Sequence, residues 1–178
     1  MATFAAVWAS IKQEGKAVPY MLIDCAGIDG GEQRIPAQIF SELQSLFTGD
    51  LAVELADVGP YLGQLNSWSD ATADVVQDLL DRHVGMLVLL KDAEPDKAEV
   101  GFTQLHRHFR KFNVVYDPSG KPLFFRYYDP QVLVDVLAVL DAKQLEAFWG
   151  PVETFVLNDR EGKVVRCQRQ GGKLAVHS

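Results

Sequence analysis

The sequence at residues 124–130 reads Phe-Phe-Arg-Tyr-Tyr-Asp-Pro and continues with Gln-Val-Leu. The aromatic run predicts a buried strand, and the Asp-Pro pair predicts that a helix starts directly after it. Asp129 can cap the free N–H groups of that helix, and Pro130 suits its first position because proline lacks an N–H that would have no partner there. Arg126 is a lone cation among four aromatic rings. It therefore needs a paired partner, and the absence of catalytic residues around it favours an architectural or recognition role.

On both sides of this stretch, hydrophobic periodicity predicts one α/β (mixed α+β) domain over residues 1–178, in which helices flank a mixed sheet. Helices are expected near the N-terminus and at 35–47, 71–83, 98–112, 130–140 and 141–149. Strands are expected at 18–25, 51–58, 85–90, 113–116, 122–128, 154–157 and 163–168, the last two forming a C-terminal hairpin. The run 85–90 has no polar alternation, which is typical of a central strand.

The strand expected at 122–128 also predicts which side chains face the same side of the sheet. Alternate residues of a strand face opposite sides, so Arg126 and Tyr128 would share one face while Phe125 and Tyr127 share the other. One of the two faces belongs to the core, and the sequence leaves open which one. The turn before this strand is Asp117-Pro118-Ser119-Gly120, in which each residue type suits turn chemistry.

Composition indicates a soluble globular protein of the cytoplasm. The chain has 178 residues, 48% hydrophobic residues and a net charge of −7, which argues against a nucleic-acid partner and against binding to an anionic membrane. The N-terminus lacks the positive region of a signal peptide, and the longest apolar run is too short to cross a bilayer. The two cysteines, Cys25 and Cys167, are expected to be free thiols in a reducing compartment.

Catalytic and metal-binding patterns are weak, so no cofactor is expected. His106 and His108 are two apart on a helix and point in different directions, and the expectation is that His106 borders the core while His108 is solvated. There is no Gly-x-Ser-x-Gly elbow and no phosphate-binding glycine motif. In the basic cluster on the same helix, Arg107 and Lys111 are expected on a solvated face, whereas Arg110 is expected to have a structural or binding role.

Four segments together resemble the effector chaperone (adaptor) domain of bacterial type VI secretion systems. They are Leu-His-Arg-His-Phe-Arg-Lys-Phe at 105–112, the Asp-Pro-Ser-Gly turn, the junction at 124–133, and Phe-Trp-Gly-Pro at 148–151. Segments 20–24, 46–49 and 59–62 also fit, so that the resemblance covers about residues 18–156. Gln131 stands where the family usually has arginine, and His108-Phe109-Arg110 stands where it has His-Leu-Arg.

The resemblance implies an adaptor without enzymatic activity, which binds a toxic effector in the cytoplasm and helps to load it onto the spike protein of the secretion tube. Longer members carry a helical C-terminal extension, so the cargo contacts of this chain are expected to be fewer or differently placed. Arg110 and Arg126 would hold the helix and the junction together, through Asp129 or another carboxylate. Tyr127 or Tyr128, with Trp149, could anchor a partner, although a purely fold-determining role is equally compatible. The motif or partner-binding residues are Arg110, Arg126, Tyr127, Tyr128, Asp129, Pro130, Trp149, Gly150 and Pro151.

Two other functions remain open. An immunity protein would neutralise a toxin instead of delivering it, and an acidic surface could suit a basic toxin. A small-molecule-binding or catalytic α/β domain would need a pocket with convergent polar groups, for which the sequence gives no sign.

Overall fold

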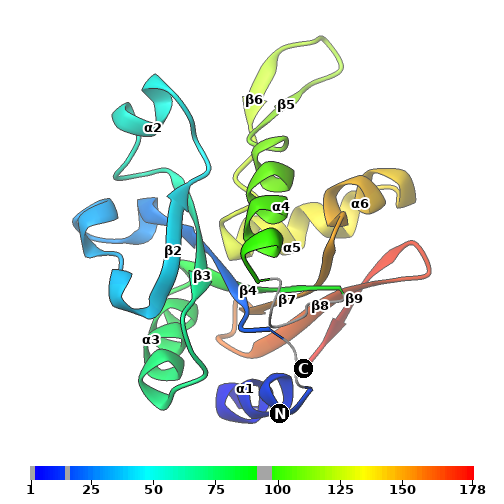
Figure 1. Ribbon diagram of the computed structural model, residues 1–178. Coiled ribbons are helices and arrows are strands. Elements are labelled where there is room, and N and C mark those ends of the chain that lie inside the picture. The colour runs from blue at the N-terminus through cyan, green and yellow to red at the C-terminus, as the bar shows by residue number, and fades with distance from the viewer. Residues whose placement is uncertain (1–2, 15–16, 92–97) are drawn as a thin grey trace.

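The computed structural model describes residues 3–14, 17–91 and 98–178, with the backbone alone at 98–100. Helices lie on both faces of one large sheet (Figure 1). The strands are β1 (Tyr20–Asp24), β2 (Phe40–Ser45), β3 (Pro60–Leu65), β4 (Gly85–Leu90), β5 (Val114–Tyr116), β6 (Pro122–Phe124), β7 (Val152–Asn158), β8 (Val164–Gln170) and β9 (Lys173–His177). The α-helices are α1 (Phe4–Gln13), α2 (Asp50–Glu54), α3 (Asp70–Asp81), α4 (Ala98–Arg110), α5 (Pro130–Val139) and α6 (Ala142–Trp149).

The large sheet has seven strands in the order β2-β3-β1-β4-β7-β8-β9. Each of its six strand pairings is antiparallel, so the α+β class is confirmed while the sheet is not mixed. β4 is the fourth of the seven strands and is buried throughout, as its unbroken apolar sequence predicts. β5 and β6 form a separate two-stranded sheet.

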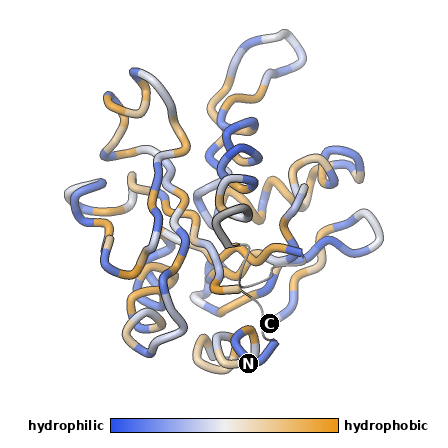
Figure 2. The backbone as a smooth tube through the Cα atoms, in the orientation of Figure 1, coloured by the Kyte–Doolittle hydropathy of each residue, from blue (hydrophilic) through white to orange (hydrophobic). Residues whose placement is uncertain are grey.

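Each face of the sheet has its own hydrophobic core. Successive residues of β4 alternate between them: Met86, Val88 and Leu90 join one core, whereas Leu87 and Leu89 join the other. The first core is closed by apolar residues of α4, α5 and α6, and the second by residues of α1 and α3. Figure 2 shows the hydrophobic colour concentrated along the central strands.

Two predictions between residues 35 and 58 are wrong. The segment 35–47 is not a helix; it forms short 3₁₀ turns and then β2. Ile39, Leu43 and Leu46 satisfy a helical spacing, but pairing of β2 with β3 decides the local structure. The segment 51–58 is not a strand, because α2 occupies its first part and the strand is β3, which starts at Pro60.

The hairpin lies where the sequence predicts it, but its second strand is shorter than expected. β6 ends at Phe124, so Arg126, Tyr127 and Tyr128 lie in a turn and the expected alternation of faces does not apply. Both strands of the hairpin are exposed rather than buried. At the C-terminal end, the pairing of β7 with β8 is confirmed, but the hairpin is not the last element, because β9 adds a further strand beside β8.

Candidate functional site

Arg126 joins the end of β1 to the start of α5. Its Nη2 lies 2.7 Å from Oδ2 of Asp24 and 3.5 Å from Oδ2 of Asp129. The Asp24 side chain is only 5% exposed, whereas that of Arg126 is 48% exposed. The hydrogen bond to Asp24 raises the pKa of Arg126 further above its already high value. The cation therefore neutralises a buried carboxylate, and its predicted need for a partner is met by two acidic residues.

Asp129 and Pro130 start α5 as the sequence predicts. Oδ1 of Asp129 accepts hydrogen bonds from the backbone N–H of Gln131 at 3.0 Å and of Val132 at 3.4 Å. Pro130 is buried at the first position of the helix. The same carboxylate group thus caps a helix through one oxygen and meets Arg126 with the other.

Tyr127 and Tyr128 belong to the core. Tyr127 is fully buried, its ring stacks on Phe109 with centroids 5.5 Å apart, and burial raises the pKa of its hydroxyl well above the ordinary value. That hydroxyl lies 3.0 Å from the carbonyl oxygen of Phe109 and 2.9 Å from Oδ1 of Asn113, and can donate its single proton to either. These contacts lock the C-terminal end of α4 against the junction.

The element Trp149-Gly150-Pro151 turns the chain from α6 into β7. Trp149 is buried and its indole N–H donates to the carbonyl of Glu153, while Gly150 ends α6 with φ 49°. His108 lies against this turn; its Nε2 is 2.7 Å from the carbonyl oxygen of Phe148. The expectation that His108 is solvated is wrong, because the side chain is buried and His106 is the more exposed of the two histidines. Tyr127, Tyr128 and Trp149 are buried, so the three predicted aromatic anchors are not exposed in this structure.

Arg110 lies apart from the Arg126 junction. It is exposed near the C-terminal end of α4, and its Nη2 lies 3.5 Å from Oγ1 of Thr48. It lines an open groove of about 450 Å³ together with Arg107 and Lys111 of the same region. Arg110 therefore does not contact Asp129 as expected, but lies in this groove.

The walls of the groove are apolar and come from two projecting elements. Leu46, Phe47 and Leu51 line it on the side of α2, and Val114 and Phe124 line it on the side of the β5–β6 hairpin. Figure 1 shows α2 and the hairpin standing out at the same end of the molecule. We call these residues, with the three basic side chains, the groove.

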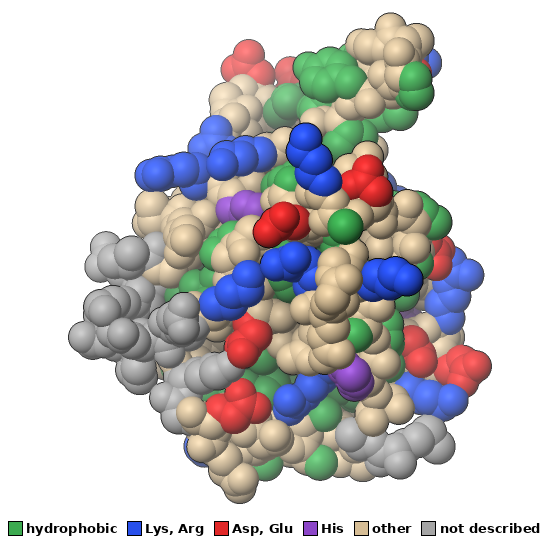
Figure 3. All heavy atoms as spheres, turned by 90° about the vertical axis from the view of Figure 1, so that its right-hand side faces the viewer, with side chains coloured by type: hydrophobic (Ala, Val, Ile, Leu, Met, Phe, Trp, Pro, Cys, Tyr) green, Lys and Arg blue, Asp and Glu red, His purple; other side chains and the backbone are tan. Residues whose placement is uncertain are grey.

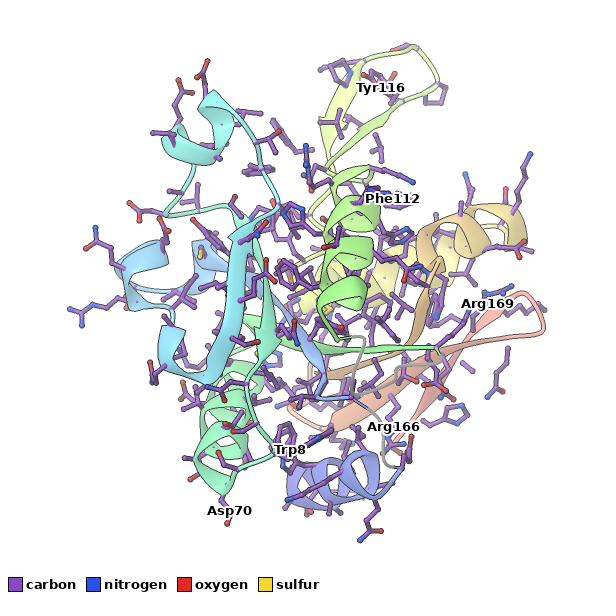
Figure 4. All side chains as sticks on the ribbon, in the orientation of Figure 1. Trp8, Asp70, Phe112, Tyr116, Arg166 and Arg169 are labelled. Carbon is purple, nitrogen blue, oxygen red and sulfur yellow. The ribbon has the colours of Figure 1, made fainter. Side chains whose placement is uncertain are left out.

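Exposed apolar side chains concentrate around the groove. Among the large hydrophobic residues that are exposed in the described chain, most lie on or beside α2 and the hairpin; they are Leu51, Val53, Val58, Val114, Val115, Tyr116, Leu123 and Phe124. Tyr116 is 71% exposed at the outer part of the hairpin (Figure 4), and Phe124 is 60% exposed. Figure 3 shows hydrophobic side chains gathered on the hairpin above the body, with Lys and Arg side chains below it.

The sequence prediction missed this surface for a physical reason. The strand expected at 51–58 and the hairpin expected at 113–128 do not by themselves reveal an exposed surface, because apolar side chains are more often buried than exposed. The signal that could have identified the hairpin is its shortness: three-residue strands around an Asp-Pro-Ser-Gly turn carry apolar residues at consecutive positions, so that one face must be left uncovered.

Neither the groove nor the rest of the described residues holds a metal-binding cluster or an exposed thiol. No group of three His, Cys, Asp or Glu side chains among them is placed to hold a metal ion. Cys25 and Cys167 are both free and buried, and burial raises the pKa of each thiol to about 12. No helix in the described ranges is both long enough and apolar enough to cross a membrane.

The fold and the groove define an α+β protein with a seven-stranded antiparallel sheet and an exposed apolar and cationic surface at one end. A family model described as a domain of unknown function, DUF4123, matches residues 19–147, and the chain therefore belongs to this family. The match includes the groove and the Arg126 junction but stops before Gly150 and Pro151. No curated protein matches the chain, and no solved structure matches it either.

Proposed function

We propose that this protein is a cytoplasmic adaptor that binds a toxic effector of a bacterial type VI secretion system and helps to load it onto the spike protein of the tube. The observation that carries the proposal is the groove, where exposed apolar and cationic side chains meet at one end of a well-packed body. Contiguous exposed apolar surface rimmed by polar groups marks sites of protein association. A binding module needs such a surface.

Two further observations support the proposal. The family match covers most of the chain, and the motif segments at 105–112 and 124–133 that resemble effector chaperones lie within it. In the structure these segments pack on one another through Phe109 and Tyr127 and end beside the groove. The motif residues therefore build the support of a binding surface, while the exposed groove makes the contact.

The proposal does not assign an enzymatic activity. The groove is open, and its polar side chains are Arg, Lys, Thr and Asn, without an acid–base pair. A small-molecule site would enclose its ligand between convergent polar groups. An immunity protein would also present a binding surface, and the experiment below separates it from an adaptor.

The test is a gene deletion in a strain with an active secretion system. We expect loss of delivery of one toxin to neighbouring cells, survival of the deletion strain, and recovery of delivery when the intact gene is restored. Secretion of the tube protein is the control, because it should continue. Death of the deletion strain through its own toxin would identify an immunity protein. Unchanged delivery of every toxin would overturn the proposal.

A further inference from the structure

The cations of the groove have no acidic partner in the described part of the chain. Arg107, Arg110 and Lys111 are exposed, and no carboxylate lies within ion-pairing distance of them, although the protein carries a net charge of −7. By contrast, Arg126 and Arg160 each lie against an aspartate. A like-charged cluster without counter-ions complements a negatively charged ligand.

The walls of the groove select among negatively charged ligands. Leu51, Val114 and Phe124 present apolar surface on both sides of the basic cluster, and the ring of Phe124 meets Phe47 edge-on at 6.2 Å between centroids. A nucleic acid would gain little from apolar walls, and the overall negative charge of the protein would repel it. A polypeptide that alternates carboxylates with apolar side chains satisfies both the walls and the cations.

The hairpin would gain stability from such a ligand. β5 and β6 have three residues each, pair only with one another, and are exposed along both strands. An isolated two-stranded hairpin is marginally stable in water, and gains stability when it packs against a further element. The apolar side chains that remain uncovered on this hairpin are where that element would pack.

We infer that the groove binds an acidic, amphipathic segment of a protein partner, whose carboxylates pair with Arg107, Arg110 and Lys111 while its apolar side chains pack between α2 and the hairpin. Guanidinium groups suit this role because they pair with carboxylates through two parallel hydrogen bonds. The inference rests on the proposed function in so far as the segment belongs to the effector, and it goes further by stating the chemistry of that segment.

The first experiment measures the affinity of the protein for the effector that co-purifies with the wild-type protein. The groove variant carries Arg107→Glu, Arg110→Glu and Lys111→Glu. The control variant carries Arg34→Glu, Lys143→Glu and Lys173→Glu, which are also exposed and have no ion-pair partner among the described residues. Either set changes the net charge by −6, from −7 to −13. We expect the affinity to fall about tenfold or more for the groove variant and to change less than about twofold for the control.

A milder variant excludes a folding defect as the cause. Replacing the same three residues by Gln removes the charges without placing acids at the C-terminal end of α4, where they would oppose the helix dipole. Its melting temperature should match the wild type while its affinity still falls. Equal retention of the partner by groove, control and wild-type proteins would overturn the inference and leave the adaptor function standing.

A second experiment uses synthetic probes and needs no natural partner. Two amphipathic peptides share the same leucine positions and carry either Glu or Lys at the remaining positions. In methyl NMR spectra we expect the Glu peptide to shift Leu51 and Val114, which line the groove, with Val139, an exposed valine outside the groove, as the unshifted control. The effect should weaken at high salt. Shifts with neither peptide, or equal shifts with both, would overturn the inference even if the adaptor function holds. Unchanged toxin delivery in the deletion strain would overturn the adaptor function but not the binding of the Glu peptide.

Discussion

Arg126 and Asp24 are 102 positions apart in the chain, and their contact ties the first strand to the helix that follows the motif. The aspartate is almost fully buried and also accepts a hydrogen bond from the backbone of Ala26. A buried carboxylate without a cation would carry an uncompensated charge. At the residue scale, the motif is therefore a charge-neutralising clamp.

Replacing Arg126 by Ala should lower the free energy of unfolding by about 1–2 kcal/mol, because Asp24 would lose its charged partner while the exposure of Arg126 moderates the effect. Denaturant titration measures the change. The double variant R126A/D24N should recover part of the loss, since it removes the uncompensated charge as well. An unchanged free energy of unfolding for R126A would refute the clamp.

His108 should make stability depend on pH. Burial lowers the pKa of His108 in the folded protein, and the nearby Lys111 acts in the same direction, against the hydrogen bond to Phe148. Below the ordinary value of about 6.5 the unfolded chain takes up the proton first, so stability is full above that pH and declines as the pH falls toward the folded pKa. The decline is at most about 1.4 kcal/mol per pH unit for one proton.

The measurement is chemical unfolding between pH 7.5 and pH 5 for the wild type and for His108→Gln. The glutamine amide can still donate a hydrogen bond to the carbonyl of Phe148 but does not titrate. The wild type should lose more stability over this range than the variant. Identical slopes would show that His108 does not contribute.

At the scale of elements, α4, α5 and α6 are held together around a few aromatic rings. Phe109 and Phe148 contact each other and also Tyr127, which connects the three helices to the junction. Gly150 ends α6 directly against the ring of His108, so that a side chain at this position would overlap the ring. The end of α6 is therefore fixed by packing as well as by backbone conformation.

Gly150→Ala should destabilise the protein by at least about 2 kcal/mol, because its φ of 49° and ψ of −118° are strained for alanine and the new methyl group meets His108. Gly162→Ala is the matched control: its φ is 75°, but no atom lies within 4 Å of the added carbon. It should cost only about 1 kcal/mol. Thermal unfolding of both variants gives the comparison, and equal losses would remove the packing contribution of His108.

In the whole molecule, different parts provide stability and recognition. The sheet and its two cores bury nearly all of the large side chains, whereas α2 and the hairpin leave theirs exposed at one end. Side chains on that surface contribute little to folding and are available to a partner.

The triple variant V115S/Y116S/L123S should therefore keep the free energy of unfolding within about 1 kcal/mol of the wild type, because exposed substitutions away from packed features have small effects. The same variant should bind less of a fluorescent apolar dye such as ANS, since three exposed apolar side chains are removed. Denaturant titration and dye fluorescence test the two statements. A loss of several kcal/mol would mean that the hairpin packs against the body.

Features that depend on local chemistry could be predicted from the sequence. The Asp129-Pro130 start of α5, the cap of Asp141 on α6, and the turn at 117–120 all follow from hydrogen bonds between residues a few positions apart. The central strand β4 followed from its unbroken apolar run. Those signals do not depend on what the segment packs against.

Where long-range partners compete with local periodicity, the outcome follows from the folded chain. Residues 40–45 form a strand because β3 pairs with them, and Asp24, which is remote in the chain, was found as the partner of Arg126 only from the fold. The groove arises because α2 and the hairpin stand out at the same end of the molecule, although their sequences are over sixty positions apart between Leu51 and Val114. Whether an apolar residue is core or binding surface depends on what covers it, and covering is a property of the folded chain.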